Sequence, residues 1–269
     1  MERSSIRPGN RMTFELLNVH IDDRVAVVQM NRPAARNALS QALMSELMLC
    51  ARELADRVDI DVVLLTGDER CFSAGADLKD ERAWADESKS LVVRRQIASL
   101  GYRMCKAWEE MPQITIAVIE GYAIGGGLAL ALACDWRVAA ENAFVSLPEI
   151  ALGIPLTWGT IPRLTSLLGP ARAKRLVILC ERVAVAEALA NGLVDYLAPP
   201  SQALARARQL AAQVLAKPAA AVRMSKESIN AVATALDHVA GYAAHDQLAL
   251  SAASAEAREA RQAALRNKG

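Results

Sequence analysis

Aromatic side chains and excess charge of either sign are both scarce in this 269-residue chain. Aromatic residues make up 4% of it, and 31 Lys and Arg face 30 Asp and Glu, so the formal net charge is +1. Proteins that bind nucleic acids usually carry a basic excess, and those that bind single strands also use aromatic stacking platforms. The composition therefore argues against a nucleic-acid partner.

Long apolar runs are absent as well. The most apolar stretch, residues 114–134, is interrupted by Glu120 and by four glycines, so it is too broken to cross a bilayer. No secretory hydrophobic segment is present, and residues 1–12 carry three arginines without an apolar face, which is typical of a flexible tail. We therefore expect no membrane partner and a cytoplasmic location.

Cysteine and histidine are too few and too scattered for most metal or disulfide frameworks. The five cysteines form no CxxC pair and the three histidines lie far from the glycine-rich segments. The motifs GxSxG, HExxH, Walker A and the Rossmann GxGxxG are also missing. We expect reduced cysteines, no metal site and no separate cofactor.

What the chain does contain is apolar and alanine-rich, with 53% hydrophobic residues. Alternating and continuous apolar runs predict strands over residues 14–20, 25–30, 62–66 and 114–119, and shorter ones over 136–139 and 144–145. Helices are expected from the Ser40 cap to about residue 58, over 91–110 and over 128–134. We expect the chain to consist of a flexible tail (1–12), an α/β core (13–198) and a helical region (199–269).

Two small-residue loops follow predicted buried strands, over residues 71–77 and 121–127. Glycine and alanine at a strand end let backbone N–H groups approach a ligand closely, and the second loop also opens a helix. One N–H from each loop would form an oxyanion hole, which stabilises charge on a carbonyl oxygen. The alternative is that the glycines only permit tight turns and close helix packing.

Glu149 is the acid with the most unusual surroundings. It lies in the segment Leu147-Pro148-Glu149-Ile150, between apolar residues and prolines. A desolvated carboxyl has a raised pKa, which suits it for proton transfer near neutral pH. The alternative is an ordinary solvated glutamate in a loop.

In order and spacing, these segments resemble the crotonase (enoyl-CoA hydratase/isomerase) superfamily over nearly the whole chain. The resemblance implies a spiral of β-β-α turns with a C-terminal helical trimerisation region. It also implies a homotrimer or dimer of trimers and an acyl-CoA thioester substrate. The segments that carry it are Asn31-Arg32-Pro33, Asn37-Ala38-Leu39, residues 62–67, residues 72–78, residues 121–127 with Cys134-Asp135, Pro148-Glu149-Ile150 with Leu152-Gly153, and residues 187–194.

The resemblance also assigns roles to single residues. Ala76 and Gly126 correspond to the two oxyanion donors, and the carbonyl of Ala74 to a contact with the adenine amino group. Ala35 and Arg36 fall where the CoA moiety runs, and the charge of Arg36 suits a phosphate.

Three more residues complete the substrate-binding set expected from the sequence. Gly125 belongs to the second loop, and Asp77 fixes the first loop through hydrogen bonds to its backbone. Trp158 stands where the family commonly has a glycine pair, and its indole either lines the acyl site or packs against the core.

The chain departs from the family at one catalytic position. Hydratases of this family use two glutamates, of which the second corresponds to Glu149 and the first to Ala129. A single glutamate still moves a proton, so the sequence predicts either 2-enoyl-CoA hydration or Δ3,Δ2 double-bond isomerisation. The alternatives are an aromatic enoyl-CoA hydratase-lyase and a non-catalytic acyl-CoA-binding member.

Overall fold

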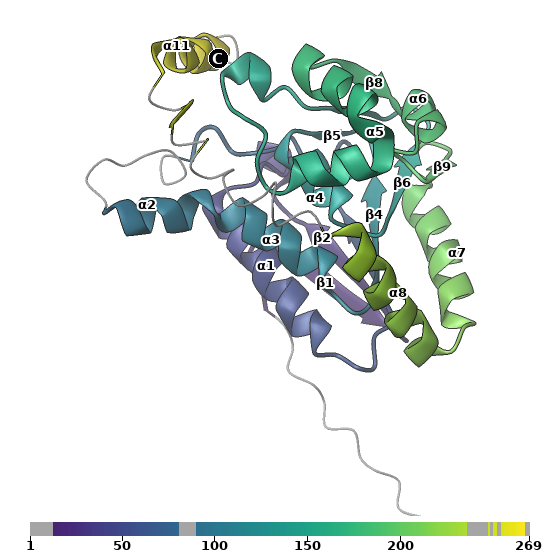
Figure 1. Cartoon of the computed structure of the whole chain (residues 1–269). Helices are drawn as coiled ribbons and strands as arrows, with labels where there is room; N and C mark the ends of the chain where they lie inside the picture. The colour runs from purple at the N-terminus through teal and green to yellow at the C-terminus, as the bar shows by residue number, and fades with distance from the viewer. Residues whose placement is uncertain (1–12, 81–89, 236–246, 248–249, 252–253, 267–269) are drawn as a thin grey trace, which may run out of the picture.

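The main element of the fold is a six-stranded sheet with the strand order β1-β2-β3-β4-β6-β9 (Figure 1). The computed structural model describes residues 13–80, 90–235, 247, 250–251 and 254–266, so the tail expected over 1–12 lies outside the described residues. All neighbouring strands are parallel except β1 and β2. The strands are β1 (Leu17–Asp22), β2 (Val25–Met30), β3 (Val62–Thr66), β4 (Ile114–Ile119), β6 (Trp136–Ala140) and β9 (Tyr196–Ala198).

The apolar runs of the inner strands are continuous because both faces of this sheet are covered. In β3, Val63 and Leu65 belong to one hydrophobic core, whereas Val62 and Leu64 belong to a second. Successive side chains of a strand point to opposite faces, so a strand buried on both sides has no polar alternation. This confirms the α/β class that the sequence predicted.

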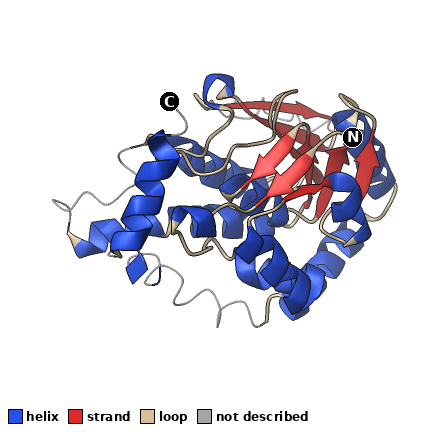
Figure 2. Ribbon diagram, turned by 90° about the horizontal axis from the view of Figure 1, so that it is seen from above, coloured by secondary structure: helices blue, strands red, loops and turns tan. Residues whose placement is uncertain are grey.

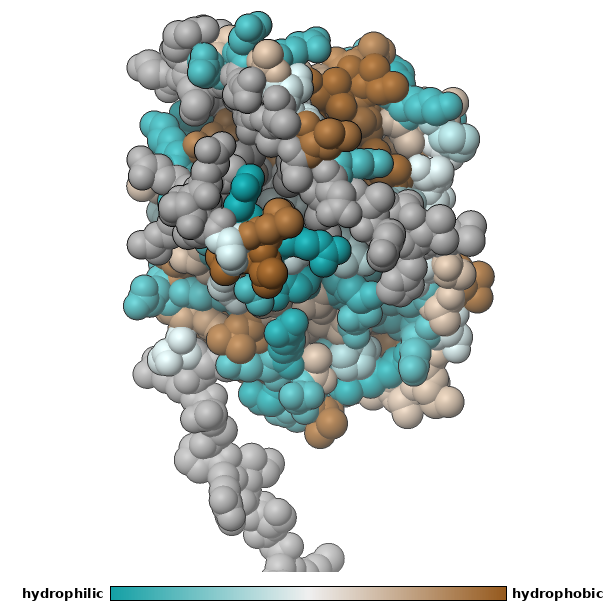
Figure 3. Space-filling model, turned by 60° about the vertical axis from the view of Figure 1, so that its left-hand side comes forward, coloured by the Kyte–Doolittle hydropathy of each residue, from teal (hydrophilic) through white to brown (hydrophobic). Residues whose placement is uncertain are grey.

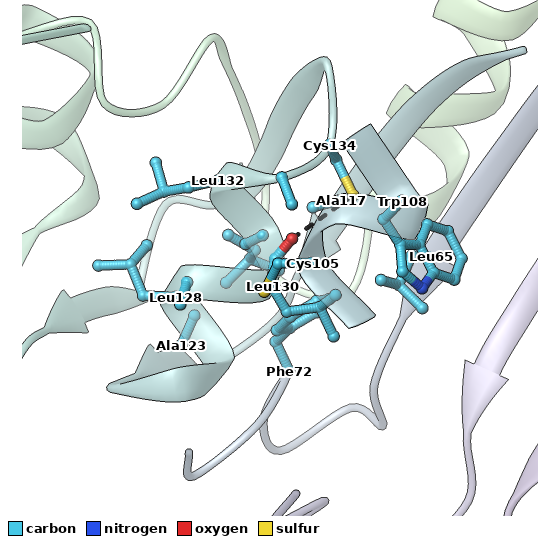
Figure 4. Close-up of a cluster of buried hydrophobic side chains, with 14 of the residues drawn as sticks. Leu65, Phe72, Cys105, Trp108, Ala117, Ala123, Leu128, Leu130, Leu132 and Cys134 are labelled. Atoms are coloured by element: carbon cyan, nitrogen blue, oxygen red, sulfur yellow. Dashed lines mark hydrogen bonds between the residues drawn. The ribbon is translucent and has the colours of Figure 1, made fainter. Parts of the chain in front are cut away.

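Helices supply the other half of each core. The helices α1 (Gln41–Ala55), α3 (Leu100–Glu109) and α4 (Gly126–Leu132) contribute to the larger core, part of which surrounds Phe72 and Trp108 in Figure 4. On the other face, α7 (Ala203–Leu215) buries Ala203, Ala207 and Leu210 at helical spacing against β3, β4 and β6. The division at residue 198 remains a prediction.

A second sheet of three short strands lies beside the first, in the order β5-β7-β8. It comprises β5 (Tyr122–Ile124), β7 (Phe144–Ser146) and β8 (Arg182–Ala184), and helices flank the strands when the molecule is viewed from above (Figure 2). The remaining helices are α2 (Leu91–Ala98), α5 (Thr160–Leu179), α6 (Val185–Ala190), α8 (Ala219–Ala233) and α11 (Ala255–Arg266), with 3-10 turns at Pro33–Ala35 and Ile150–Leu152.

The structure corrects the sequence prediction at several boundaries. The Ser40 side chain caps α1 as expected, by accepting a hydrogen bond from the Leu43 N–H, but the helix ends at Ala55 and Val58 is 83% exposed. The single helix expected over 91–110 is two helices that meet at Ser99. The three-residue strands β5, β8 and β9 were not predicted, because so short a segment shows no periodicity.

Apolar side chains also reach the surface. On the face in Figure 3 they form several groups separated by polar residues. The largest exposed fractions on α2 belong to Leu91 and Val92. Scattered exposed apolar residues are normal in folded proteins.

A buried ion pair connects α8 to the sheet. The ammonium of Lys226 donates to the Asp135 carboxylate at 2.6 Å and to the carbonyl of Gln113 at 2.7 Å. The same carboxylate oxygen accepts from the backbone N–H and hydroxyl of Thr115. Asp135 follows α4, so one carboxylate joins α8, β4 and the end of α4.

Lys226→Met removes one partner of this pair and leaves a largely buried carboxylate without its counter-ion. We expect a loss of about 3 kcal/mol in the free energy of unfolding, measured by urea denaturation at pH 7. Lys174→Met on the exposed surface of α5 is the matched control and should change stability by less than about 0.5 kcal/mol. Equal effects of the two substitutions would contradict the structural role of Lys226.

Candidate active site

Backbone hydrogen bonds join the two predicted loops. The N–H of Phe72 donates to the carbonyl of Tyr122 at 2.9 Å, and the N–H of Ile124 donates to the carbonyl of Ser73 at 3.0 Å. Ser73 and Ala123 form a parallel bridge. Segments about fifty residues apart in the sequence are thus held in one register, as the oxyanion-hole hypothesis requires.

The two expected oxyanion donors come close together through this pairing. A β-carbon added at Gly75 would stand 2.7 Å from the carbonyl oxygen of Ile124 and 3.3 Å from the nitrogen of Gly126. Gly75 has φ +88°, so both space and backbone conformation demand glycine here. Within the described part of the chain, no hydrogen bond is made by the N–H of Ala76 or Gly126. Both donors are therefore free to bind a ligand oxygen.

Glu149 reaches the same place from the loop after β7. A β-carbon at Gly125 would stand 2.7 Å from its Oε1 atom, and its Oε2 atom is buried without a hydrogen-bond partner in the described structure. Burial raises the pKa of the Glu149 carboxyl from 4.5 to about 7, because the charged form loses its hydration. The carboxyl is thus suited to accept and return a proton near neutral pH.

The turn that follows Glu149 is held by the C-terminal part of the chain. The backbone carbonyl of Glu149 accepts hydrogen bonds from the N–H groups of Leu152 and Ile154, both at 2.9 Å. The Ser251 hydroxyl donates to the carbonyl of Gly153 at 2.7 Å, and a β-carbon at Gly153 would stand 2.6 Å from Cα of Ala257 in α11. Helix α11 therefore packs directly on the segment that positions the carboxyl.

A cavity of about 120 Å³, hereafter the Glu149 cavity, contains these groups. Glu149 is the one ionisable side chain among the described residues of its wall, and Ala129 lines it with a methyl group. The described part of the wall therefore contains no second carboxylate, in agreement with the alanine at position 129. The described wall consists of Ala74, Gly75, Ala76, Leu78, Ile124, Gly125, Gly126, Ala129, Pro148, Glu149, Leu152, Ile154, Pro155, Leu156, Thr157, Trp158 and Thr160.

Of the residues expected along the CoA moiety, Ala74 forms part of this wall. Ala35 and Arg36 lie beside the wall. Ala35 ends a 3-10 turn, and Arg36 has φ +54° and an exposed side chain. The carbonyl of Arg36 accepts the N–H of Ala74 at 3.0 Å, which places the two segments side by side. The Asp77 carboxylate binds the Arg32 guanidinium at 2.8 Å and accepts the N–H of Lys79, so it fixes its loop.

Trp158 faces the cavity, and its position depends on two glycines. A β-carbon at Gly126 would stand 2.7 Å from Cη2 of the indole and closer still to Cζ3, and one at Gly101 in α3 would overlap the indole. The residue itself has φ +60°, which for a bulky side chain costs about 1–3 kcal/mol and is found mainly at functional positions. The indole both lines the cavity and packs against the larger core, so the two expectations for Trp158 are compatible in the structure.

Sequence reasoning missed the residues that hold this tryptophan. The Arg163 guanidinium donates to the Trp158 carbonyl at 2.9 Å and forms a two-pronged pair with the Glu109 carboxylate at 2.6 and 2.8 Å. Gly101 was also missed, although an isolated glycine inside a helical pattern usually has a packing reason. No comparable signal marked Arg163, because its partner is more than fifty residues away.

A larger groove of about 730 Å³ lies between α5, α7 and α8. Its wall includes the Lys226–Asp135 pair and apolar residues such as Leu210 and Ile229. The smaller cavity is the stronger candidate for an active site, because the free N–H groups and the carboxyl with the raised pKa meet there. Among the described residues, no cluster of three or more His, Cys, Asp or Glu side chains could hold a metal ion, and no helix is long and apolar enough to span a membrane.

Comparisons with known proteins point to one family. A family model described as enoyl-CoA hydratase/isomerase matches residues 20–267. The chain is 33% identical to a crotonyl-CoA hydratase of Syntrophomonas wolfei and 34% identical to a short-chain-enoyl-CoA hydratase of Clostridium acetobutylicum. Each alignment spans 220 residues and 81% of this chain, and covers 83% and 82% of those proteins. An enoyl-CoA hydratase structure from Mycobacterium avium subsp. paratuberculosis has a TM-score of 0.84 at 28% identity, covering 95% of this chain and 97% of that one.

The raised pKa of Glu149 makes stability depend on pH. The folded protein holds the proton up to about pH 7, whereas the unfolded chain releases it near pH 4.5, so stability falls between these values and then levels. Glu149→Gln removes this loss and should be more stable than the wild type by roughly 3 kcal/mol above pH 7. Urea unfolding of both proteins at pH 4 and pH 8 measures the difference in their free energies of unfolding. If that difference is the same at both pH values, the result would contradict the burial of the charge.

Proposed function

Because the chain belongs to the enoyl-CoA hydratase/isomerase family of the crotonase superfamily, whose enzymes act on CoA thioesters, we propose that it moves the double bond of an enoyl-CoA between the Δ3 and Δ2 positions. The observation that carries this proposal is the Glu149 carboxyl. It is the one ionisable group in the described cavity wall, it has a buried oxygen without a partner, and its pKa is about 7.

The proposed reaction consists of two proton transfers. The Glu149 carboxylate takes a proton from C2 of a 3-enoyl thioester, and the electron pair moves onto the thioester oxygen. The N–H groups of Ala76 and Gly126 hold this oxygen, and loss of one such donor typically costs about 10²–10³ in rate. The protonated Glu149 then returns the proton to C4, which leaves the 2-enoyl thioester. No water enters the balance, so a second carboxylate is not required.

Hydration of a 2-enoyl-CoA is the second candidate. It is supported by the names of two relatives, a crotonyl-CoA hydratase and a short-chain-enoyl-CoA hydratase. In this reaction Glu149 would have to activate water and serve C2 alone, because Ala129 supplies neither charge nor a hydrogen bond. We therefore expect hydration to be the slower of the two reactions.

The proposal includes the assembly and the location expected from the sequence. Exposed apolar side chains on α8, among them Met224, Ile229 and Val232, support a homotrimer or a dimer of trimers. Light scattering of the purified protein tests the assembly, and a monomer at micromolar concentration would contradict it. The cytoplasmic location rests on the sequence alone.

Glu149→Gln should lower kcat for 3-enoyl-CoA isomerisation by about 10²–10⁴-fold, because the amide cannot accept a proton. The measurement is the absorbance of the conjugated 2-enoyl thioester. Glu141→Gln, an exposed carboxyl in the turn before β7, is the matched control and should retain the wild-type rate. Full activity of Glu149→Gln would remove the residue from the mechanism.

The pH profile provides an independent test of the same role. Proton abstraction requires the carboxylate, so kcat/KM should rise as the pH increases through about 7 and then reach a plateau. A profile that is flat from pH 5.5 to pH 8.5 would contradict Glu149 as the general base.

A further inference from the structure

The indole of Trp158 and the Glu149 carboxyl occupy the space above two consecutive glycines. The space that a side chain at Gly125 would fill holds Oε1 of Glu149, and the space at Gly126 holds the six-membered ring of the indole. Gly126 also supplies one of the proposed oxyanion donors. The indole therefore lies next to the position of the thioester oxygen.

The position left without a carboxylate lies on the same side of α4. Ala129 follows Gly126 by three residues, so the two lie on one face of the helix, and both line the Glu149 cavity together with Trp158. An alanine at this position leaves room that a glutamate would fill. The indole extends over this face from the loop before α5.

Several fixed contacts hold the indole in place. Trp158 and Gly159 have φ values of +60° and +69°, and the Trp158 carbonyl accepts a hydrogen bond from Nη1 of Arg163. The Arg163 guanidinium is buried and is paired with Glu109 of α3, and Gly101 on the same helix provides the surface for the ring. A side chain fixed on both its backbone and its ring acts as a rigid wall.

The resulting cavity is small. Its volume of about 120 Å³ lies below the range of about 300–1,000 Å³ that is usual for ligand sites. A cavity of this size favours a short acyl group over a long one. The CoA moiety would lie outside it, in the region of Ala35 and Arg36.

We propose that Trp158 is a specificity-determining residue that forms a wall of the Glu149 cavity and restricts the substrate to short acyl groups. This inference rests on the proposed function. Gly101 and Gly126 provide the space for the indole, and Arg163 and Glu109 position it.

The direct test compares acyl chain lengths in the wild type and in Trp158→Ala. The wild type should have its highest kcat/KM with the four-carbon 3-enoyl-CoA. Trp158→Ala should shift the ratio of the eight-carbon to the four-carbon substrate by at least about tenfold toward the longer chain, because the wall is removed. Trp136→Ala on β6, away from the cavity wall, is the matched control and should leave the ratio unchanged. An unchanged ratio in Trp158→Ala would overturn the inference.

Binding separates a failure of this inference from a failure of the proposed function. Calorimetry with saturated butyryl-CoA and octanoyl-CoA requires no turnover. One possible result is that the wild type converts neither enoyl-CoA but binds butyryl-CoA more tightly than octanoyl-CoA, and that Trp158→Ala loses this preference. The proposed function would then be wrong, and the inference about Trp158 would be supported. If neither thioester binds, both proposals are wrong.

Gly101→Ala tests the packing of the indole without touching the substrate. In the wild-type background the added methyl overlaps the ring, so Tm should fall and the selectivity for the four-carbon substrate should change. In the Trp158→Ala background the same substitution should raise Tm, because alanine favours the helix and the overlap is gone. An equal decrease of Tm in both backgrounds would show that the indole does not rest on Gly101.

Discussion

The proposed active site depends on the hydrogen-bonded register between the loop after β3 and strand β5. The bonds from Phe72 to Tyr122 and from Ile124 to Ser73 are made by the backbone, so they place the Ala76 and Gly126 N–H groups side by side without any catalytic side chain. Glycine at position 75 follows from this approach, since a β-carbon there would meet the facing strand. The position of both proposed donors is therefore set by backbone hydrogen bonds between the two segments.

Burial of Glu149 suits the carboxyl for proton transfer and also lowers the stability of the folded protein when the carboxyl is charged. The same loss of hydration that raises the carboxyl pKa to about 7 makes the charged form unfavourable in the folded protein. The segment around it is fixed by hydrogen bonds from Leu152 and Ile154 and by packing against α11. The fold thus maintains an unfavourable group in place, as is common for residues that transfer protons.

Ala129 and Trp158 line the same cavity. The Trp158 indole lies over Gly126, and a glycine in α3 makes room for the ring. The buried Arg163–Glu109 pair supports the strained backbone of Trp158. These contacts bring several segments, far apart in the sequence, together at the cavity wall.

The sequence by itself determined the α/β class, the inner strands, the Ser40 cap, both glycine-rich loops, Glu149 and the missing acid at Ala129. These features depend on side-chain periodicity or on short local patterns, which the chain displays directly. The tertiary structure alone decided the orientation of Trp158, the pairing of Arg163 with Glu109, the Lys226–Asp135 connection and the three-residue strands. Their contacts join residues distant in sequence, and such contacts are set by how the elements pack, for which no local pattern carries a signal.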